Sequence, residues 1–114
     1  MLFAALLIAA QTYFTSPTPP AELHGKQAVV ETTLGTFVID FDADAAPNLA
    51  AYFAKLSREG AYEGTIFHRM MKYGLVQAGD PVSKDPAKRA QYGTGGLNAV
   101  KAEARAPRMT RGSV

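Results

Sequence analysis

The sequence contains no cysteine, and this absence removes several classes of chemistry at once. A disulfide, a thiolate nucleophile and a cysteine-based metal site are all excluded. Export from the cytoplasm remains compatible with this composition, because a chain with a large enough core needs no disulfide.

Histidine is almost as scarce. The two histidines, His24 and His68, lie far apart in the sequence, and no carboxylates with ligand spacing surround them. His68 is the sole candidate base for a nucleophilic triad, but the Gly-x-Ser-x-Gly elbow is absent. The run GTGG at residues 93–96 lacks the Lys-Ser/Thr of a phosphate-binding loop and indicates a flexible turn instead. We therefore expect no metal and no cofactor.

An excess of charge is also lacking. The formal net charge is only +2, which argues against a nucleic-acid partner. Residues 84–114 do hold seven lysines and arginines against two acidic residues. Apart from Tyr92 this part has no interleaved aromatic residue, and it shows no helical or strand pattern. It is predicted to be a solvated loop.

The only long apolar run is the N-terminal stretch MLFAALLIAA, residues 1–10, which also has no charge. It is about half as long as a bilayer span, so no stable membrane span is expected. It resembles the apolar region of a secretory signal and ends in small residues, although no lysine or arginine precedes it. We predict a signal peptide at 1–12 and export to the bacterial periplasm or the exterior. A short N-terminal anchor and a misassigned start codon are the alternatives. Residues 13–26, rich in Pro, Thr and Ser, are predicted to be a linker.

A β-hairpin and a helix are predicted next. Residues 28–42 alternate in β-branched and aromatic side chains around a turn at Leu34-Gly35. Residues 42–60 are predicted to contain a helix with Pro47 in its first turn and Gly60 just beyond its end. Its expected buried stripe consists of Leu49, Phe53 and Leu56.

Two further strands are predicted around 65–71 and 74–78, followed by a long loop over 81–110 and a last strand that begins at Arg111. The two short strands carry Arg69 and Gln77 among apolar residues. Arg69 could be a buried arginine satisfied by carbonyl groups or by Asp80. Alternatively, it could be a fixed cationic donor over an apolar pocket that polarises an atom of an uncharged peptide.

Several motifs together resemble one family. They are T-x-x-G-x-F-x-I in the hairpin, AP-x-x-x-x-x-F in the helix, Y-x-G-T-x-FHR, Q-x-GDP and GTGG. Over about residues 28–114 the chain resembles the N-terminal half of a cyclophilin, a peptidyl-prolyl cis–trans isomerase. The resemblance implies a closed antiparallel β-barrel capped by helices. We therefore expect a mainly β chain with helix, in which residues 27–114 form an incomplete barrel, capped by one helix and truncated at its C-terminus.

The resemblance also implies the site. Arg69 takes the position of the catalytic arginine, and Phe67 would face the core. The residues expected to bind substrate are His68, Leu75, Gln77 and Gly93. The implied partners are proline-containing peptides and unfolded protein clients. A non-catalytic proline-peptide binding module and an inactive truncated fragment remain as alternatives.

The floor of the proline pocket departs from the family pattern. Gly74 stands where the family usually has a phenylalanine at the floor of the proline pocket. Losing an aromatic ring there would cost on the order of 1–3 kcal/mol of binding. Tyr73 could lean into the pocket in its place.

Overall fold

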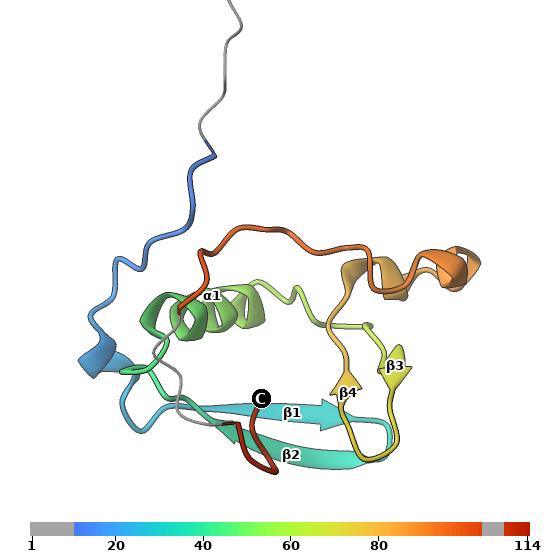
Figure 1. The fold of residues 1–114 in the computed structure, drawn as a ribbon, viewed down its shortest axis with the longest axis horizontal. Helices are drawn as coiled ribbons and strands as arrows, with labels where there is room; N and C mark the ends of the chain where they lie inside the picture. The colour runs from blue at the N-terminus through green and yellow to red at the C-terminus, as the bar shows by residue number, and fades with distance from the viewer. Residues whose placement is uncertain (1–10, 104–108) are drawn as a thin grey trace, which may run out of the picture.

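The computed structural model describes residues 11–103 and 109–114 (Figure 1). Most of the predicted signal peptide, residues 1–10, lies outside the described residues. The elements are η1 (Pro20–Leu23), β1 (Gln27–Thr32), β2 (Gly35–Asp40), α1 (Pro47–Arg58), β3 (Arg69–Met70), β4 (Val76–Gln77), η2 (Pro81–Lys84) and η3 (Pro86–Gln91), where η denotes a 3₁₀-helix.

The first hairpin forms, but its turn lies one residue earlier than the predicted Leu34-Gly35, because Gly35 is the first residue of β2. β1 pairs antiparallel with β2, and Thr32 lies opposite Gly35, so that residues 33–34 make a two-residue turn. Gly35 has a φ of +140°, which a residue with a side chain rarely adopts. Along β1 the side chains alternate between exposed and half-buried, as expected for a strand with one covered face.

Helix α1 begins and ends where its local signals predict. Pro47 is the first helical residue. At the other end Gly60 has a φ of +71°. Its N–H donates to the carbonyl of Ser57, and the N–H of Ala61 donates to the carbonyl of Leu56. These two bonds are the Schellman pattern, which satisfies carbonyls that the helix itself leaves open.

The buried face of α1 was predicted wrongly. The buried residues are Ala50, Ala51 and Ala54, whereas Leu49 is 45% exposed. The helix turns its small side chains toward Leu23 of η1, because an alanine face permits close approach of the neighbouring backbone. Phe53, also expected in the buried stripe, is only half-buried.

The core is small. Among the described residues the buried apolar side chains are one leucine, Leu23, and four alanines. Phe14 and Phe41 pack against this cluster. Phe14 and Leu23 both come from the predicted linker at 13–26, so part of that segment packs against the domain. Stacked and edge-on rings extend the cluster, with Phe53 5.9 Å from Phe41 and 5.0 Å from Tyr62 between centroids.

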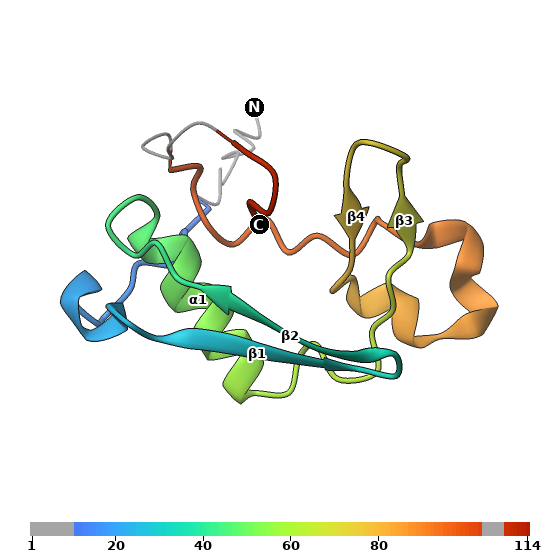
Figure 2. The same ribbon diagram turned by 90° about the horizontal axis from the view of Figure 1, so that it is seen from below.

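The strands form two separate two-stranded sheets, β1–β2 and β3–β4. In Figures 1 and 2 the β3–β4 hairpin stands beside η2 and η3, at the other end of the molecule from η1. The described residues therefore form no closed barrel. This arrangement is compatible with the incomplete barrel expected from the sequence.

Two predictions for the C-terminal third were wrong. The long loop predicted over 81–110 contains η2 and η3, because Asp80 and Asp85 each precede a proline and accept a hydrogen bond from the backbone two residues on. The strand expected from Arg111 is absent from residues 109–114, which form a turn closed by a bond from the Ser113 N–H to the Thr110 carbonyl.

After η3 the chain returns over α1 (Figure 1). The N–H of Phe14 donates to the carbonyl of Ala99 over 2.7 Å. The carboxylate of Glu103 then reaches the start of α1, where it accepts from the backbone N–H groups of Asn48 at 3.0 Å and Leu49 at 2.9 Å. Because Ala46 at the N-cap offers no side-chain acceptor, a residue far along the sequence caps this helix.

Candidate active site

The β3–β4 hairpin collects three of the predicted site residues on one face. Arg69 lies directly opposite Gln77 in the ladder. The N–H of Met71 donates to the carbonyl of Leu75 over 2.8 Å, which continues the pairing past the strands. Because side chains alternate between the two faces of a hairpin, Arg69, Gln77, Met71 and Leu75 share one face. A guanidinium and an amide thus lie beside two apolar side chains.

The guanidinium of Arg69 is exposed. Its Nη1 lies 3.5 Å from Oε1 of Gln77, at the limit of a hydrogen bond, and its Nη2 lies 3.1 Å from Sδ of Met71. Within the described part of the chain it forms no ion pair. The alternative of a buried arginine satisfied by carbonyls or by Asp80 is therefore wrong. Arg69 presents donors to whatever occupies this face.

The apolar side of the face is open. Leu75 is 45% exposed. Phe67, expected to face the core, is 43% exposed, so that prediction was wrong. Tyr73 does not replace the missing aromatic ring of the pocket floor: it is exposed, with a φ of +60°, and Nζ of Lys72 lies 5.0 Å from its ring. A Cβ at Gly74 would lie 3.2 Å from Cβ of Met71.

His68 and Gly93 meet each other, away from that face. A Cβ at Gly93 would lie 3.6 Å from Nε2 of His68, so the imidazole rests on the backbone of the 93–96 loop. Both ring nitrogens of His68 are covered, and neither bonds to a described residue. The backbone N–H of His68 donates to the carbonyl of Gln77 over 3.0 Å, which ties the imidazole to the hairpin.

Asp80, expected from the sequence only as a possible partner of Arg69, bonds instead to backbone N–H groups. The residue is buried, and its carboxylate accepts from the backbone N–H of Val82 at 2.9 Å and from that of Gly93 in a short bond. Burial alone would raise the pKa of Asp80, but the N–H groups of Gly93 and Val82, the nearby imidazole of His68 and the N–H of Gly95 together hold the pKa below its ordinary value of 3.8. The Asp80-Pro81 dipeptide is a signal for a helix cap, but it does not reveal the contact with Gly93.

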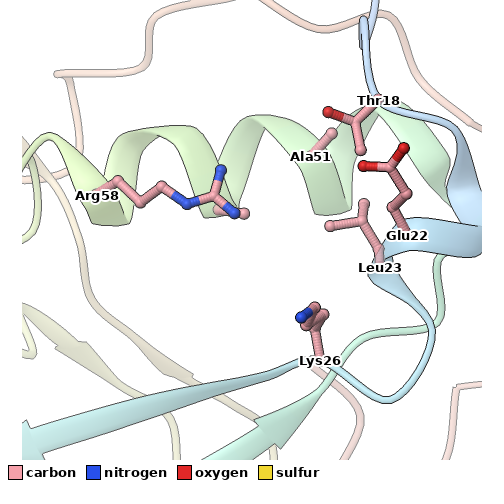
Figure 3. A pocket seen from close by; sticks show the side chains of 7 residues that line it. Thr18, Glu22, Leu23, Lys26, Ala51 and Arg58 are labelled. Atoms are coloured by element: carbon pink, nitrogen blue, oxygen red, sulfur yellow. The ribbon is translucent and has the colours of Figure 1, made fainter.

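A cavity lies elsewhere, between η1 and α1. It has a volume of about 470 Å³, with side chains from the two segments facing one another across it (Figure 3). Its lining includes Leu23, Lys26 and Arg58 but none of the predicted site residues. Its lining is mixed and polar, so it is no candidate for the proline pocket.

Metal ligands and membrane spans were sought in the same described residues. They contain no group of three or more His, Asp or Glu side chains arranged to hold a metal ion. None of the helices in 11–103 or 109–114 is long and apolar enough to cross a bilayer.

The class of protein follows from comparison with known families. Residues 28–114 match the model of the family described as cyclophilin type peptidyl-prolyl cis-trans isomerase/CLD. The chain belongs to this family.

Its relatives include "peptidyl-prolyl cis-trans isomerase-like 1" of Neurospora crassa, 39% identical over 56% of this chain and 39% of that protein. The protein of the same name from Homo sapiens is 35% identical over 66% of this chain and 45% of that protein. A "peptidyl-prolyl cis-trans isomerase" of Synechococcus elongatus is 44% identical over 48% of this chain and 38% of that protein. The chain thus spans less than half the length of these relatives. No solved structure matched it.

Proposed function

We propose that this protein is a peptidyl-prolyl cis–trans isomerase that acts on proline-containing peptides and on unfolded protein clients. One observation carries the proposal: Arg69, Gln77 and Leu75 share an exposed face of one hairpin. The face combines a charged donor, an amide and an apolar wall, which are the groups that hold a neutral peptide around a proline ring. Family membership supports the same reading.

Rotation about an X–Pro bond breaks no covalent bond, so the protein needs only to position groups that stabilise the twisted state. The barrier to rotation about an X–Pro bond is about 20 kcal/mol, and the uncatalysed event takes tens of seconds or more. Turnover at about 10³ s⁻¹ requires roughly five orders of magnitude, or about 7 kcal/mol. No covalent intermediate and no cofactor is needed for this step.

Arg69 would supply the stabilisation. As the X–Pro bond twists, amide resonance is lost and the proline nitrogen gains a basic lone pair. A guanidinium N–H aimed at that nitrogen binds the twisted state better than either planar state, which is the condition for catalysis. Gln77 would hold the peptide backbone, and Leu75 would contact the ring.

Substitution of Arg69 tests the proposal. We expect Arg69→Ala to lower isomerase kcat/KM by about two orders of magnitude or more, the usual cost of removing a transition-state donor, with an unchanged far-UV circular dichroism spectrum. Arg89→Ala is the matched control, because Arg89 is an exposed arginine on η3 and does not belong to the β3–β4 hairpin. Near wild-type activity of Arg69→Ala would rule out the assignment.

A non-catalytic proline-peptide binding module is the second candidate. It is favoured by Gly74 and by the outward-facing Tyr73, which leave the pocket without an aromatic floor. Titration with a proline-containing tetrapeptide, followed by NMR exchange spectroscopy, separates the two functions. Saturable binding without faster exchange between cis and trans peptide would favour the module.

We also propose that the protein is exported. The support is the uncharged apolar run at residues 1–10 with its terminal small residues. N-terminal sequencing of the protein recovered from its native cells should then begin near residue 13. A mature protein that still begins at residue 1 and fractionates with membranes would indicate an N-terminal anchor instead.

A further inference from the structure

Asp80 lies where three segments of the site meet. It follows β4 by three residues and begins the turn into η2. Its carboxylate reaches 13 positions along the chain to the N–H of Gly93. On the other side, Oγ of Ser83 donates to the Asp80 carbonyl over 2.6 Å and accepts from the N–H of Ile66 over 3.1 Å. The turn is therefore tied both to the segment that leads into β3 and to the 93–96 loop.

We propose that Asp80 is a positioning residue of the isomerase site. Its carboxylate holds residues 93–95 against His68 and so steadies the β3–β4 hairpin, to which the His68 N–H is bonded. This inference rests on the proposed isomerase function. Asp80 itself does not touch the peptide; it acts through the backbone at Gly93.

The space around the carboxylate supports this role. A Cβ at Gly95 would overlap Oδ1 of Asp80 and would lie 3.0 Å from Cγ2 of Val82. Only a residue without a side chain lets the loop backbone come this close. The neighbouring Gly96 has nothing within 4 Å of its Cβ position. The loop is thus tightly packed against the Asp80 carboxylate at Gly95 and unpacked at Gly96.

The charge around Asp80 explains why a carboxylate is needed. Within the described residues no lysine or arginine pairs with it, and the titratable side chain that faces it is His68. Its negative charge is met by backbone N–H groups, and such charge-assisted bonds are about twice as strong as neutral ones. An asparagine at this position would keep one acceptor oxygen. Its NH₂ group would replace the other oxygen and face a backbone N–H, and two donors cannot bond to each other.

The pH dependence follows from the same donors. The backbone N–H groups that bond to the Asp80 carboxylate favour its ionised form, so the pKa of Asp80 is lower in the folded than in the unfolded chain. The loop contact is therefore fully present above the ordinary aspartate pKa and is lost as the pH falls through the lower, folded-state pKa.

The test uses the ¹⁵N-labelled full chain and the backbone amide of Gly93. In the wild type we expect this amide to exchange slowly and to shift with a pH midpoint below 3.8. In Asp80→Asn we expect at least about a tenfold loss of protection, as one charged hydrogen bond supports, and no such titration. With a proline tetrapeptide, KM should rise by a similar factor, while kcat, which depends on Arg69, should change less.

Asp85→Asn is the matched control. Asp85 also precedes a proline and accepts from a backbone N–H two residues on, that of Ala87 at 3.0 Å. Because it does not contact residues 93–95, its substitution should leave both the Gly93 amide and KM unchanged. Equal protection of Gly93 in Asp80→Asn and wild type, or equal losses in the two variants, would overturn the proposal.

Two outcomes need separate readings. If Asp80→Asn fails to fold, Gly95→Ala provides a second test, because the added methyl group displaces the loop from an intact carboxylate. Gly96→Ala is its control. Unchanged exchange protection of the Gly93 amide in Gly95→Ala would refute the proposed role of Asp80. If the wild type has no isomerase activity, the proposed function fails, while the Gly93 amide still decides whether Asp80 holds the loop.

Discussion

Gly95 and Gly96 are neighbours in the sequence, yet their surroundings differ. A methyl group at Gly95 meets Asp80, Val82 and Pro81, whereas one at Gly96 meets open space. We expect Gly95→Ala to lower the free energy of unfolding by about 1–3 kcal/mol, as overpacking does. Gly96→Ala should be neutral or slightly stabilising, by about 0.4–1 kcal/mol at most. The urea midpoints of both variants check this, and equal midpoints would contradict the packing around Asp80.

Positions that follow from strand alternation could be predicted, and those that arise from tertiary contacts could not. Arg69, Leu75 and Gln77 lie on one face because alternation along the paired strands brings them there. Their roles at the site stay predictions. The contact of Asp80 with the 93–96 loop was missed, because its partner Gly93 is 13 residues away. The partner group is a backbone N–H, which almost every residue type has, so the sequence does not reveal it. The orientation of Tyr73 also depends on a backbone angle that the sequence does not dictate.

At the scale of elements, α1 depends on a remote cap. The carboxylate of Glu103 accepts from the first free N–H groups of the helix and from Nδ2 of Asn48. A negative charge there also interacts favourably with the helix dipole. Local signals predicted both ends of α1 through Pro47 and Gly60. The cap and the buried alanine face were not predictable, because both depend on segments that pack against the helix from elsewhere.

We therefore expect Glu103→Gln to lower the free energy of unfolding by about 1 kcal/mol, the typical contribution of an N-cap. Glu59→Gln is the control on the same helix. Glu59 forms an exposed pair with Lys55, which solvent screens, so its loss should cost much less than loss of the cap. Helix content near 222 nm during urea unfolding measures both. A control that costs as much as Glu103→Gln would contradict the capping role.

At the scale of the molecule, apolar side chains outnumber the partners available to cover them. Val29 and Val38 lie opposite each other in the β1–β2 ladder and are both more than half exposed, and Leu34 at the turn is 98% exposed. The sequence correctly indicated strands with a helix, but closure of a barrel requires pairing between strands that the described residues do not bring together.

This exposure predicts the behaviour of the isolated 114-residue chain. We expect it to bind the dye ANS, to associate as its concentration rises, and to unfold in urea with a small m-value, because little surface is buried to begin with. Sedimentation velocity over a range of concentrations, together with urea titrations, measures these properties. A monomer with a sharp two-state transition and no dye binding would show that the apolar faces are covered in solution.

The remote cap of α1 also has a consequence for synthesis on the ribosome. Glu103 follows Asn48 by 55 residues. At about 5–20 residues per second, its codon is translated roughly 3–11 s after that of Asn48. During that interval the helix has Pro47 at its start and no side-chain cap, so only water can accept from its leading N–H groups. Residue 103 thus completes a helix that ends at Arg58, so this part of the molecule reaches its final form only after translation has passed residue 103.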